Sequence, residues 1–480
     1  MSTRYEAVIG LEVHAQLSTN SKMFCGCSAA YGGAPNTQVC PVCLGLPGAL
    51  PVVNARAIEF AVRLGLATGC RIANQSVFAR KNYFYPDCPK DYQISQFDTP
   101  LCSDGHVDIE GGARTVRVKR IHVEEDAGKL VHVDGADHSL VDMNRSGVPL
   151  VEIVSEPDIR SGREASEYLQ KLRSLVRYLE ICDGNMEEGS LRCDVNLSVR
   201  PVGNAEFGVK TEVKNLNSFK QVEQAIEFEL ERQSKVLESG GRVTHDTLLW
   251  DAAKGRATVM RTKEEAHDYR YFPEPDLRVL RVSDATIARV GGSLPELPDA
   301  RQARFVSRYK LPAYDAALLT TARDIADYYE DVVKAGADPK AASNWVMGEV
   351  MRELNERAIE IRDFTIGAKN LAELVMLQAS GRINSSTAKD VFKQMLAGGA
   401  RAADIVAKGG LEQVSDTSAI EGDAKAVLDE NPDEVARYLA GKEQLLQFFV
   451  GQLMKRTRGK ANPKLATELI RGLLDARRKG

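Results

Sequence analysis

The side chains best suited to chemistry are carboxylates that alternate with apolar residues in short stretches of the chain. Between Val8 and Leu17, a strand would place Glu12 and His14 on one face and apolar residues on the other. Further carboxylates lie in, or directly after, predicted strands at 115–123, 150–154, 192–199 and 209–215, and they are Glu124, Glu125, Glu152, Asp194 and Glu212. Oxygen ligands of this kind suit Mg²⁺ or Mn²⁺, and Mg²⁺ usually bridges substrate phosphates. The pattern therefore predicts ATP-dependent phosphoryl transfer.

Glu152 is the carboxylate that is hardest to explain by structure alone. It lies inside the apolar stretch Leu150–Val154, and burying an isolated carboxylate is costly. We therefore expect Glu152 to pair with a cation or to bind a metal, with a solvent-facing strand position as the alternative. Alternation does not decide between Glu124 and Glu125, because neighbouring residues of a strand face opposite sides.

Basic residues near these carboxylates can take the negative charge of a triphosphate, and they are Lys81, Arg192, Lys210 and Lys214. Lys81 and Tyr83 belong to residues 80–87, a predicted loop that mixes basic and aromatic side chains. Such a loop can grip phosphates and stack on a base. Equally, its aromatic rings can fill the core.

Four of the nine cysteines form two closely spaced pairs, Cys25–Cys27 and Cys40–Cys43. Paired thiolates on short loops supply the four ligands of a tetrahedral zinc ion. Such a site is closed, so we expect a structural zinc within residues 25–43; unligated buried thiols are the alternative. The other cysteines have no partner spacing and are expected to be free.

The elements that must position these residues change type along the chain. Residues 1–293 contain the strands predicted above and one more at 129–133. They also contain a helix near 54–68 and two helices that begin at capping boxes, Ser161–Glu164 and Ser218–Gln221. The helices should cover one side of a sheet and leave a polar face on the other. After the proline-rich linker 294–298 only helical spacing remains, which predicts a helical domain at 294–408 and a small helical tail domain at 409–480.

The tail domain is basic near its end. The basic side chains there can bind a phosphate backbone, although a run of charges usually belongs to a solvated terminal helix. These side chains include Lys455, Arg456, Arg458, Lys460 and Lys464.

Composition and missing motifs exclude several functions. A formal net charge of −4 excludes a generally basic nucleic-acid coat. We find no apolar run that could span a bilayer and no room for a signal peptide, which predicts a cytoplasmic protein without a membrane contact. The chain has neither a Walker phosphate loop nor a nucleophile elbow, so hydrolysis of an amide by this chain alone is unsupported.

Several long motifs resemble one known family, the B subunits of the tRNA-dependent aspartyl/glutamyl amidotransferases. The matching stretches cover almost the whole chain and include residues 9–17, 80–87, 122–129, 152–158, 186–194, 214–219, 268–276 and 452–466. The resemblance implies an α+β fold with a glutamine-synthetase-like cradle of largely antiparallel sheet at 1–293, followed by an all-α helical domain and an all-α tail domain that hold tRNA.

The resemblance also implies a reaction. ATP would phosphorylate the side-chain carboxylate of Glu-tRNA(Gln) or Asp-tRNA(Asn), and ammonia from the A subunit, which is an amidase, would then give Gln-tRNA or Asn-tRNA. A small C subunit would join the two large ones, and Mg²⁺ or Mn²⁺, ATP and a structural zinc would be bound. Carried over by position, the first choices for the catalytic metal are His14, Glu125 and Glu152, then Glu12; Glu124, Asp194 and Glu212 would serve a second metal or the nucleotide.

Two other functions remain open from the sequence. A free-standing ATP-dependent carboxylate–amine ligase for a small molecule would use the same acidic face, but it would not need two added helical domains. A non-catalytic, zinc-stabilised tRNA-binding module would leave Glu152 unexplained.

Overall fold

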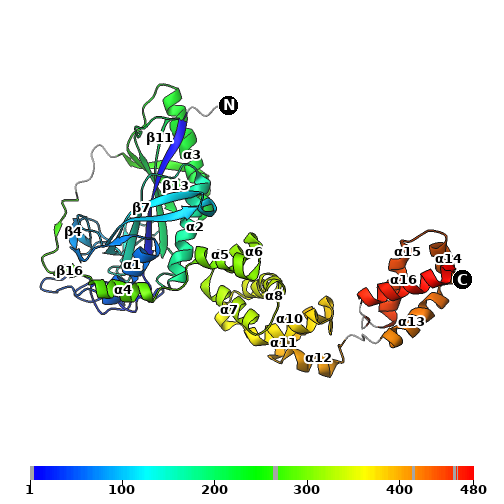
Figure 1. Cartoon of the computed structure of the whole chain (residues 1–480). Coiled ribbons are helices and arrows are strands. Elements are labelled where there is room, and N and C mark those ends of the chain that lie inside the picture. Colours follow the sequence, from blue (N-terminus) through cyan, green and yellow to red (C-terminus); the bar gives the residue numbers. More distant parts are fainter. Residues whose placement is uncertain are drawn as a thin grey trace. The chain divides into compact units, whose positions relative to one another are not determined.

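The structure is a computed structural model, and it describes residues 5–133, 135–262, 269–412, 417–457, 461 and 463–479 (Figure 1). Contacts between residues divide the chain into two compact units, Met1–Pro298 and Asp299–Gly480. The first unit carries the large sheet, and the described part of the second is helical. This confirms the predicted α+β class with a helical C-terminal region.

A nine-stranded sheet forms the centre of the first unit. Its order is β14-β13-β12-β11-β1-β10-β7-β6-β2, and every neighbouring pair is antiparallel except the parallel pair β12–β13. The strand bounds are β1 Tyr5–Gln16, β2 Arg71–Ile72, β6 Cys102–Ile109, β7 Arg114–Glu125, β10 Pro149–Ser155, β11 Leu191–Pro201, β12 Thr211–Leu216, β13 Asp246–Asp251 and β14 Arg256–Thr262. The first predicted strand, β1, therefore lies in the middle of the sheet, between β10 and β11.

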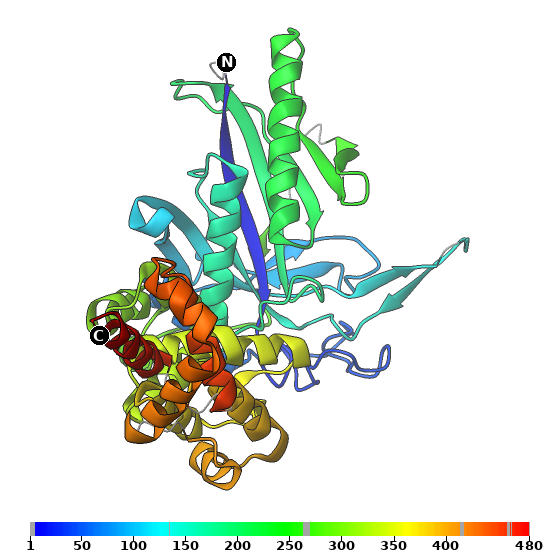
Figure 2. The same ribbon diagram turned by 90° about the vertical axis from the view of Figure 1, so that its right-hand side faces the viewer.

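Three helices cover one face of this sheet: α1 (Ala55–Ala67), α2 (Gly162–Tyr178) and α3 (Phe219–Glu238). Figure 2 shows α2 and α3 side by side along the strands. Their apolar stripes and every second residue of β1 form one core, to which β1 contributes Ala7, Ile9, Leu11, Val13 and Ala15. The alternate side chains of the strands are thus left on a second face that these helices do not cover.

The predicted capping boxes set the starts of two of these helices. The hydroxyl of Ser161 accepts from the backbone N–H of Glu164 at 3.2 Å, and that of Ser218 accepts from Gln221 N–H at 3.2 Å. Such caps satisfy N–H groups that have no partner within the helix. Both helices therefore begin where the sequence predicts.

Smaller elements surround the sheet. A three-stranded sheet joins β4 (Ala79–Asn82) to β5 (Tyr92–Ser95) and β15 (Phe272–Pro273). The predicted strand at 129–133 is β8 (Lys129–His132), which pairs with β9 (Ser139–Asp142) in a ribbon outside the large sheet (Figure 2). The remaining elements are β3 Gln75–Ser76, β16 Leu280–Arg281 and α4 Asp284–Gly292.

The described part of the second unit contains two separate apolar cores. One lies within residues 305–406 and the other within 420–474. The helix bounds are α5 Pro298–Tyr309, α6 Ala313–Leu319, α7 Arg323–Lys334, α8 Pro339–Trp345, α9 Met351–Arg357, α10 Ala368–Ala379, α11 Ser385–Gly398, α12 Ala402–Gly409, α13 Thr417–Glu430, α14 Pro432–Leu439, α15 Leu445–Arg456 and α16 Pro463–Lys479. A short π-helix at Val346–Val350 links α8 to α9.

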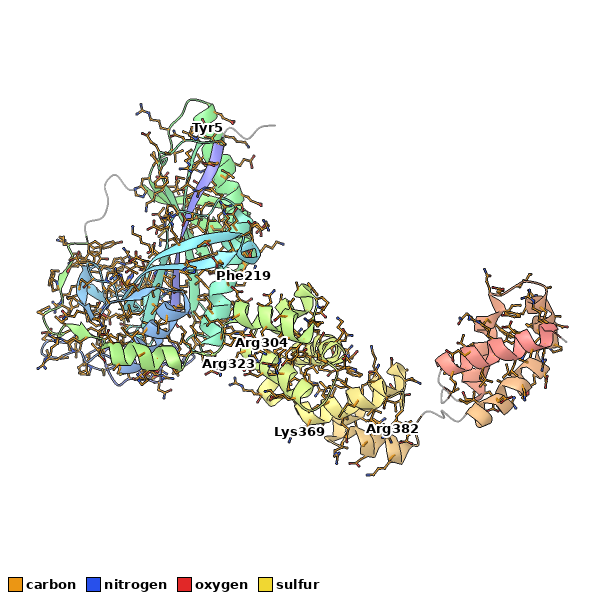
Figure 3. All side chains as sticks on the ribbon, in the orientation of Figure 1. Tyr5, Phe219, Arg304, Arg323, Lys369 and Arg382 are labelled. Atoms are coloured by element: carbon orange, nitrogen blue, oxygen red, sulfur yellow. The ribbon has the colours of Figure 1, made fainter. Side chains whose placement is uncertain are left out.

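A buried ion cluster ties α5 to α7. Glu330 accepts hydrogen bonds from Arg301 at 2.7 Å, from Arg304 (labelled in Figure 3) at 2.7 and 2.9 Å, and from the Tyr309 hydroxyl at 2.8 Å. Burial opposes ionisation of Glu330, but these bonds outweigh it and lower its pKa to about 2. A carboxyl group whose pKa is lower in the folded chain stabilises that state above its ordinary pKa, and the contribution is lost as the pH falls through the lowered value.

We therefore expect Glu330→Gln to destabilise the helices around α5 and α7 by roughly 3 kcal/mol at pH 7, since it removes the buried carboxylate that Arg301, Arg304 and Tyr309 share. The variant should also lose the part of the acid dependence of stability that lies between about pH 4.5 and 2. Peptide-resolved hydrogen exchange and urea titrations at pH 7 and pH 3 measure both effects. Glu231→Gln, which removes an exposed ion pair with Lys235, is the control. Equal protection of α5 and α7 in both variants would contradict the assignment.

Candidate functional site

Four neighbouring strands place a row of polar side chains across the uncovered face of the sheet. The register pairs His122 of β7 with Glu152 of β10, Glu152 with His14 of β1, and His14 with Arg192 of β11. Glu124 lies two residues beyond His122 on β7. The row follows from strand alternation, because directly opposed residues on adjacent strands project to the same face.

Glu152 lies at the centre of this row. Its Oε2 is 3.3 Å from His14 Nε2 and 3.6 Å from His122 Nε2, while Glu124 is 3.9 Å from His14 and 3.7 Å from His122. The exposed fraction of Glu152 is 3%. The buried carboxylate thus has the cationic or metal-ligating partners that its position in an apolar strand requires.

Electrostatics keep the central carboxylates ionised. Burial alone raises the pKa of Glu152, but His122, His14 and Lys81 outweigh burial and hold it well below its usual range. Burial likewise opposes ionisation of Glu124, yet Lys81 and His122 lower its pKa. Burial lowers the pKa of His14, whereas its hydrogen bond to Glu152 and the charges of Glu152 and Glu124 produce a net rise.

Glu12 behaves differently from these groups. Burial and the nearby charge of Glu152 raise its pKa to about 7. Two carboxylates that repel each other in this way become compatible when a cation binds between them.

Two groups of potential metal ligands share Glu152. Glu12, His14 and Glu152 form one, and His122, Glu124 and Glu152 form the other, with ligand atoms in each group within 4.8 Å of one another. The buried Oε2 of Glu124 and Nδ1 of His122 have no hydrogen-bond partner among the described residues. An unsatisfied carboxylate oxygen in a histidine–carboxylate set is chemically suited to a divalent cation.

A cavity of about 710 Å³ opens over this row. Of the predicted site residues, its lining includes Glu12, Lys81, Glu152, Lys210 and Glu212. One wall is aromatic: Phe97 stacks on Tyr271 with ring centroids 4.1 Å apart, and Lys81 Nζ lies 5.0 Å from the centroid of Tyr269. The carboxylates attract the Lys81 ammonium and raise its pKa although burial opposes this, so the cavity keeps a fixed positive charge beside its acidic floor.

Several other predicted nucleotide contacts have different partners. Arg192 donates to Asp126 at 2.9 and 3.1 Å, and Lys214 donates to both Asp194 and Glu212. Neither Arg192 nor Lys214 is among the residues that line the cavity, so their contact with a triphosphate stays a prediction. Tyr83 stacks on Tyr85, with centroids 5.7 Å apart, and is not among the residues that line the cavity.

Glu125 faces away from this group. It accepts from Lys90 Nζ and, at 3.0 Å, from the backbone N–H of Ile94, and it lines a separate cavity of about 200 Å³ beside Cys25 and Cys43. Glu124, and not Glu125, therefore lies beside His14 and His122, while metal binding by either carboxylate stays a prediction. A bulge lies earlier in β7, where Val154 pairs with Arg120 but Ser155 pairs with Val118. After this bulge the pairing is regular, so His122 and Glu124 share one face of β7 and Glu125 lies on the other.

Sequence reasoning missed several residues of the site, which include His122, Asp126, Phe97, Arg120, Tyr269 and Tyr271. His122 alternates with Glu124 on one strand, which is a signal that could have identified it. The two tyrosines lie far along the chain from the acidic strands and reach the cavity only through the tertiary fold.

The four paired cysteines converge. Their sulfurs lie within 4.8 Å of one another, and the Cys40 and Cys43 sulfurs are 3.9 Å apart. Four sulfurs bound tetrahedrally to zinc at about 2.3 Å lie about 3.8 Å apart. The hydrogen bond between Cys25 and Cys43 lowers the pKa of Cys43 and raises that of Cys25, so this pair favours one thiolate, and the thiolate is the form that binds a metal.

The basic tail is only partly described. Lys455 is exposed in the last turn of α15, while Arg456 donates to Asp423 at 3.1 Å and to Glu430 at 2.7 Å. Arg458, Lys460 and the side chain of Lys464 lie outside the described residues.

Comparisons with known proteins identify the family. A model described as the GatB/GatE catalytic domain matches residues 7–288, and one described as the GatB domain matches residues 327–474. No helix in the described parts of the chain has the length and hydropathy needed to cross a membrane.

Three relatives are all named as the B subunit of an aspartyl/glutamyl-tRNA(Asn/Gln) amidotransferase. The protein of Pelodictyon phaeoclathratiforme is 57% identical, over 97% of this chain and 98% of the relative. The protein of Chlorobaculum tepidum is 56% identical, over 98% of this chain and 100% of the relative. The protein of Thermodesulfovibrio yellowstonii is 56% identical, over 97% of this chain and 98% of the relative. These matches confirm the resemblance found in the sequence: the chain belongs to the family of aspartyl/glutamyl-tRNA(Asn/Gln) amidotransferase B subunits.

Proposed function

We propose that the chain is the B subunit of an amidotransferase that converts Glu-tRNA(Gln) to Gln-tRNA or Asp-tRNA(Asn) to Asn-tRNA. The observation that carries this proposal is the pair His122 and Glu152 in the lining of an aromatic-walled cavity, with His14 beside Glu152 on the next strand. The chain matches amidotransferase B subunits over almost its full length.

The proposed reaction has two steps in one cavity. A side-chain carboxylate oxygen of the misacylated residue attacks the γ-phosphorus of ATP, which gives an acyl phosphate and ADP. Ammonia then attacks the carbonyl carbon, and inorganic phosphate leaves with the electrons of the broken C–O bond. Because water would hydrolyse the acyl phosphate, the cavity must also limit solvent at this stage.

The residues divide the work by charge. Glu12, His14, Glu152, His122 and Glu124 would hold Mg²⁺ or Mn²⁺, which offsets negative charge on the transferring phosphoryl group when bound. Lys81, Arg120 and Lys210 present positive charge to the phosphates from the cavity lining. Phe97 and Tyr271 offer a stacked aromatic surface to an unpaired base.

The remaining components are assigned to partners. The chain has no signature of an amidase nucleophile, so ammonia would come from the A subunit, with the C subunit completing the complex. We assign residues 294–408 and 409–480 to tRNA binding and the complex to the cytoplasm. A free-standing small-molecule ligase is less favoured, because the three relatives compared above are each named as a tRNA amidotransferase subunit.

The complex of this chain with its A and C partners should release phosphate from ATP only in the presence of misacylated Glu-tRNA or Asp-tRNA. With ammonia present, the product should be Gln-tRNA or Asn-tRNA, and we expect stimulation over the rate without tRNA by at least about 100-fold, since the attacking carboxylate is otherwise absent. Correctly acylated Gln-tRNA is the control substrate. Phosphate release that follows a free carboxylic acid and ignores tRNA would favour the small-molecule ligase instead.

Adjacent residues of β7 provide a matched pair of variants. Glu124→Gln should weaken Mn²⁺ binding, followed by electron paramagnetic resonance, at least about tenfold, because it removes a charged ligand from the row. Glu125→Gln makes the same substitution one residue later, at a side chain that faces Lys90. The Mn²⁺ affinity of this variant should stay within about twofold of the unmodified chain. The reverse order of effects would return Glu125 to the metal site and remove Glu124 from it.

A further inference from the structure

Lys22 is a lysine with an exposed fraction of 0%. Its ammonium donates to the Met143 carbonyl at 3.3 Å and lies 3.7 Å from the Cys43 sulfur. Among the described residues, no carboxylate comes within ion-pair distance of it. Burying a charged amine without a counter-charge is strongly unfavourable, so a negative group beside Lys22 would stabilise its ammonium form.

The paired cysteines are the one source of negative charge that touches Lys22 in the described part of the chain. Neutral thiols do not compensate an ammonium, whereas four thiolates around a divalent ion carry a net charge of about −2. Such a dianion would be half-buried among the paired cysteines. It would therefore need a hydrogen-bond donor and a positive charge beside its sulfurs. The burial of Lys22 is therefore a second indication, independent of cysteine spacing, that these sulfurs bind a metal as thiolates.

Lys22 also connects the cysteines to the acidic face. The backbone of the adjacent Met23 donates to the Gly147 carbonyl at 2.7 Å, and Gly147 N–H donates to the Asp126 carbonyl at 2.9 Å. A Cβ at Gly147 would lie 3.4 Å from both Cys43 and Lys22, and its φ of +86° also favours glycine. This turn precedes β10, which carries Glu152.

We propose that Lys22 is a positioning residue that neutralises the four-thiolate metal site through Cys43 and fastens that site to the turn before β10. The ammonium donates one hydrogen bond to sulfur and another to the Met143 carbonyl, so the metal site and the turn share one donor. Loss of the charge should weaken metal retention even where the aliphatic stem is kept.

The test compares Lys22→Met with the unmodified full-length chain. Methionine keeps the apolar length but removes the ammonium. Transfer of zinc to a chromophoric chelator should show affinity lowered by roughly 10- to 100-fold, the usual effect of losing a partner of metal ligands. The control is Lys254→Met, which removes an exposed lysine paired with Asp251 and should leave zinc retention unchanged.

A double-mutant cycle with Cys40→Ser/Cys43→Ser separates charge compensation from packing. With the thiolates present, Lys22→Met should lower the urea midpoint; without them, it should raise the midpoint, because an uncompensated buried charge is removed. If Lys22→Met alone does not fold, recovery of folded protein in the cysteine-depleted background still supports the proposal.

Three results would overturn the role of Lys22. They are unchanged zinc affinity in folded Lys22→Met, an equal effect on the urea midpoint in both backgrounds, and no recovery of folded protein in the triple variant. None of these readouts depends on amidotransferase activity, so the result is independent of the proposed function.

Discussion

The burial of the Glu152 carboxylate is the constraint on which the first unit depends. A carboxylate in the middle of an apolar central strand is tolerable only with compensating groups at contact distance. Both neighbouring strands supply one at the paired position, His14 from β1 and His122 from β7. An antiparallel register fixes these pairs, so a slip by one residue in either strand would bring an apolar side chain against Glu152. The strand register that forms the sheet therefore also brings the site residues together.

The two faces of the sheet serve different purposes. The helix-covered face contains one continuous apolar core, which holds the strands in register. The other face gathers carboxylates, histidines and lysines. Burial and neighbouring charges shift the pKa values of several of them, namely Glu12, His14, Lys81, Glu124 and Glu152. Groups with shifted pKa values are common at functional sites, because their charges complement a ligand even where they lower the stability of the fold.

Strand alternation in the sequence was enough to predict most of the acidic face. It placed Glu12 and His14 on one face of β1, and the capping boxes located α2 and α3. Alternation left Glu124 and Glu125 undecided, because neighbouring residues of a strand face opposite sides, and the preference for Glu125 came from the family resemblance. It also could not foresee that Arg192 would pair with Asp126, since that ion pair joins strands distant in sequence. Long-range pairing of side chains is set by tertiary packing, which local pattern does not encode.

The proposed chemistry depends above all on a divalent cation that binds beside Glu152, between histidines of two different strands. The most direct measurement is the anomalous scattering of Mn²⁺ in crystals of the chain with its partner subunits and a non-hydrolysable ATP analogue. We expect manganese bound to Glu152 together with His14 or His122, next to the phosphates of the analogue. Manganese bound only near Asp194 and Glu212, with phosphates outside the cavity floored by Glu152, would contradict this mechanism.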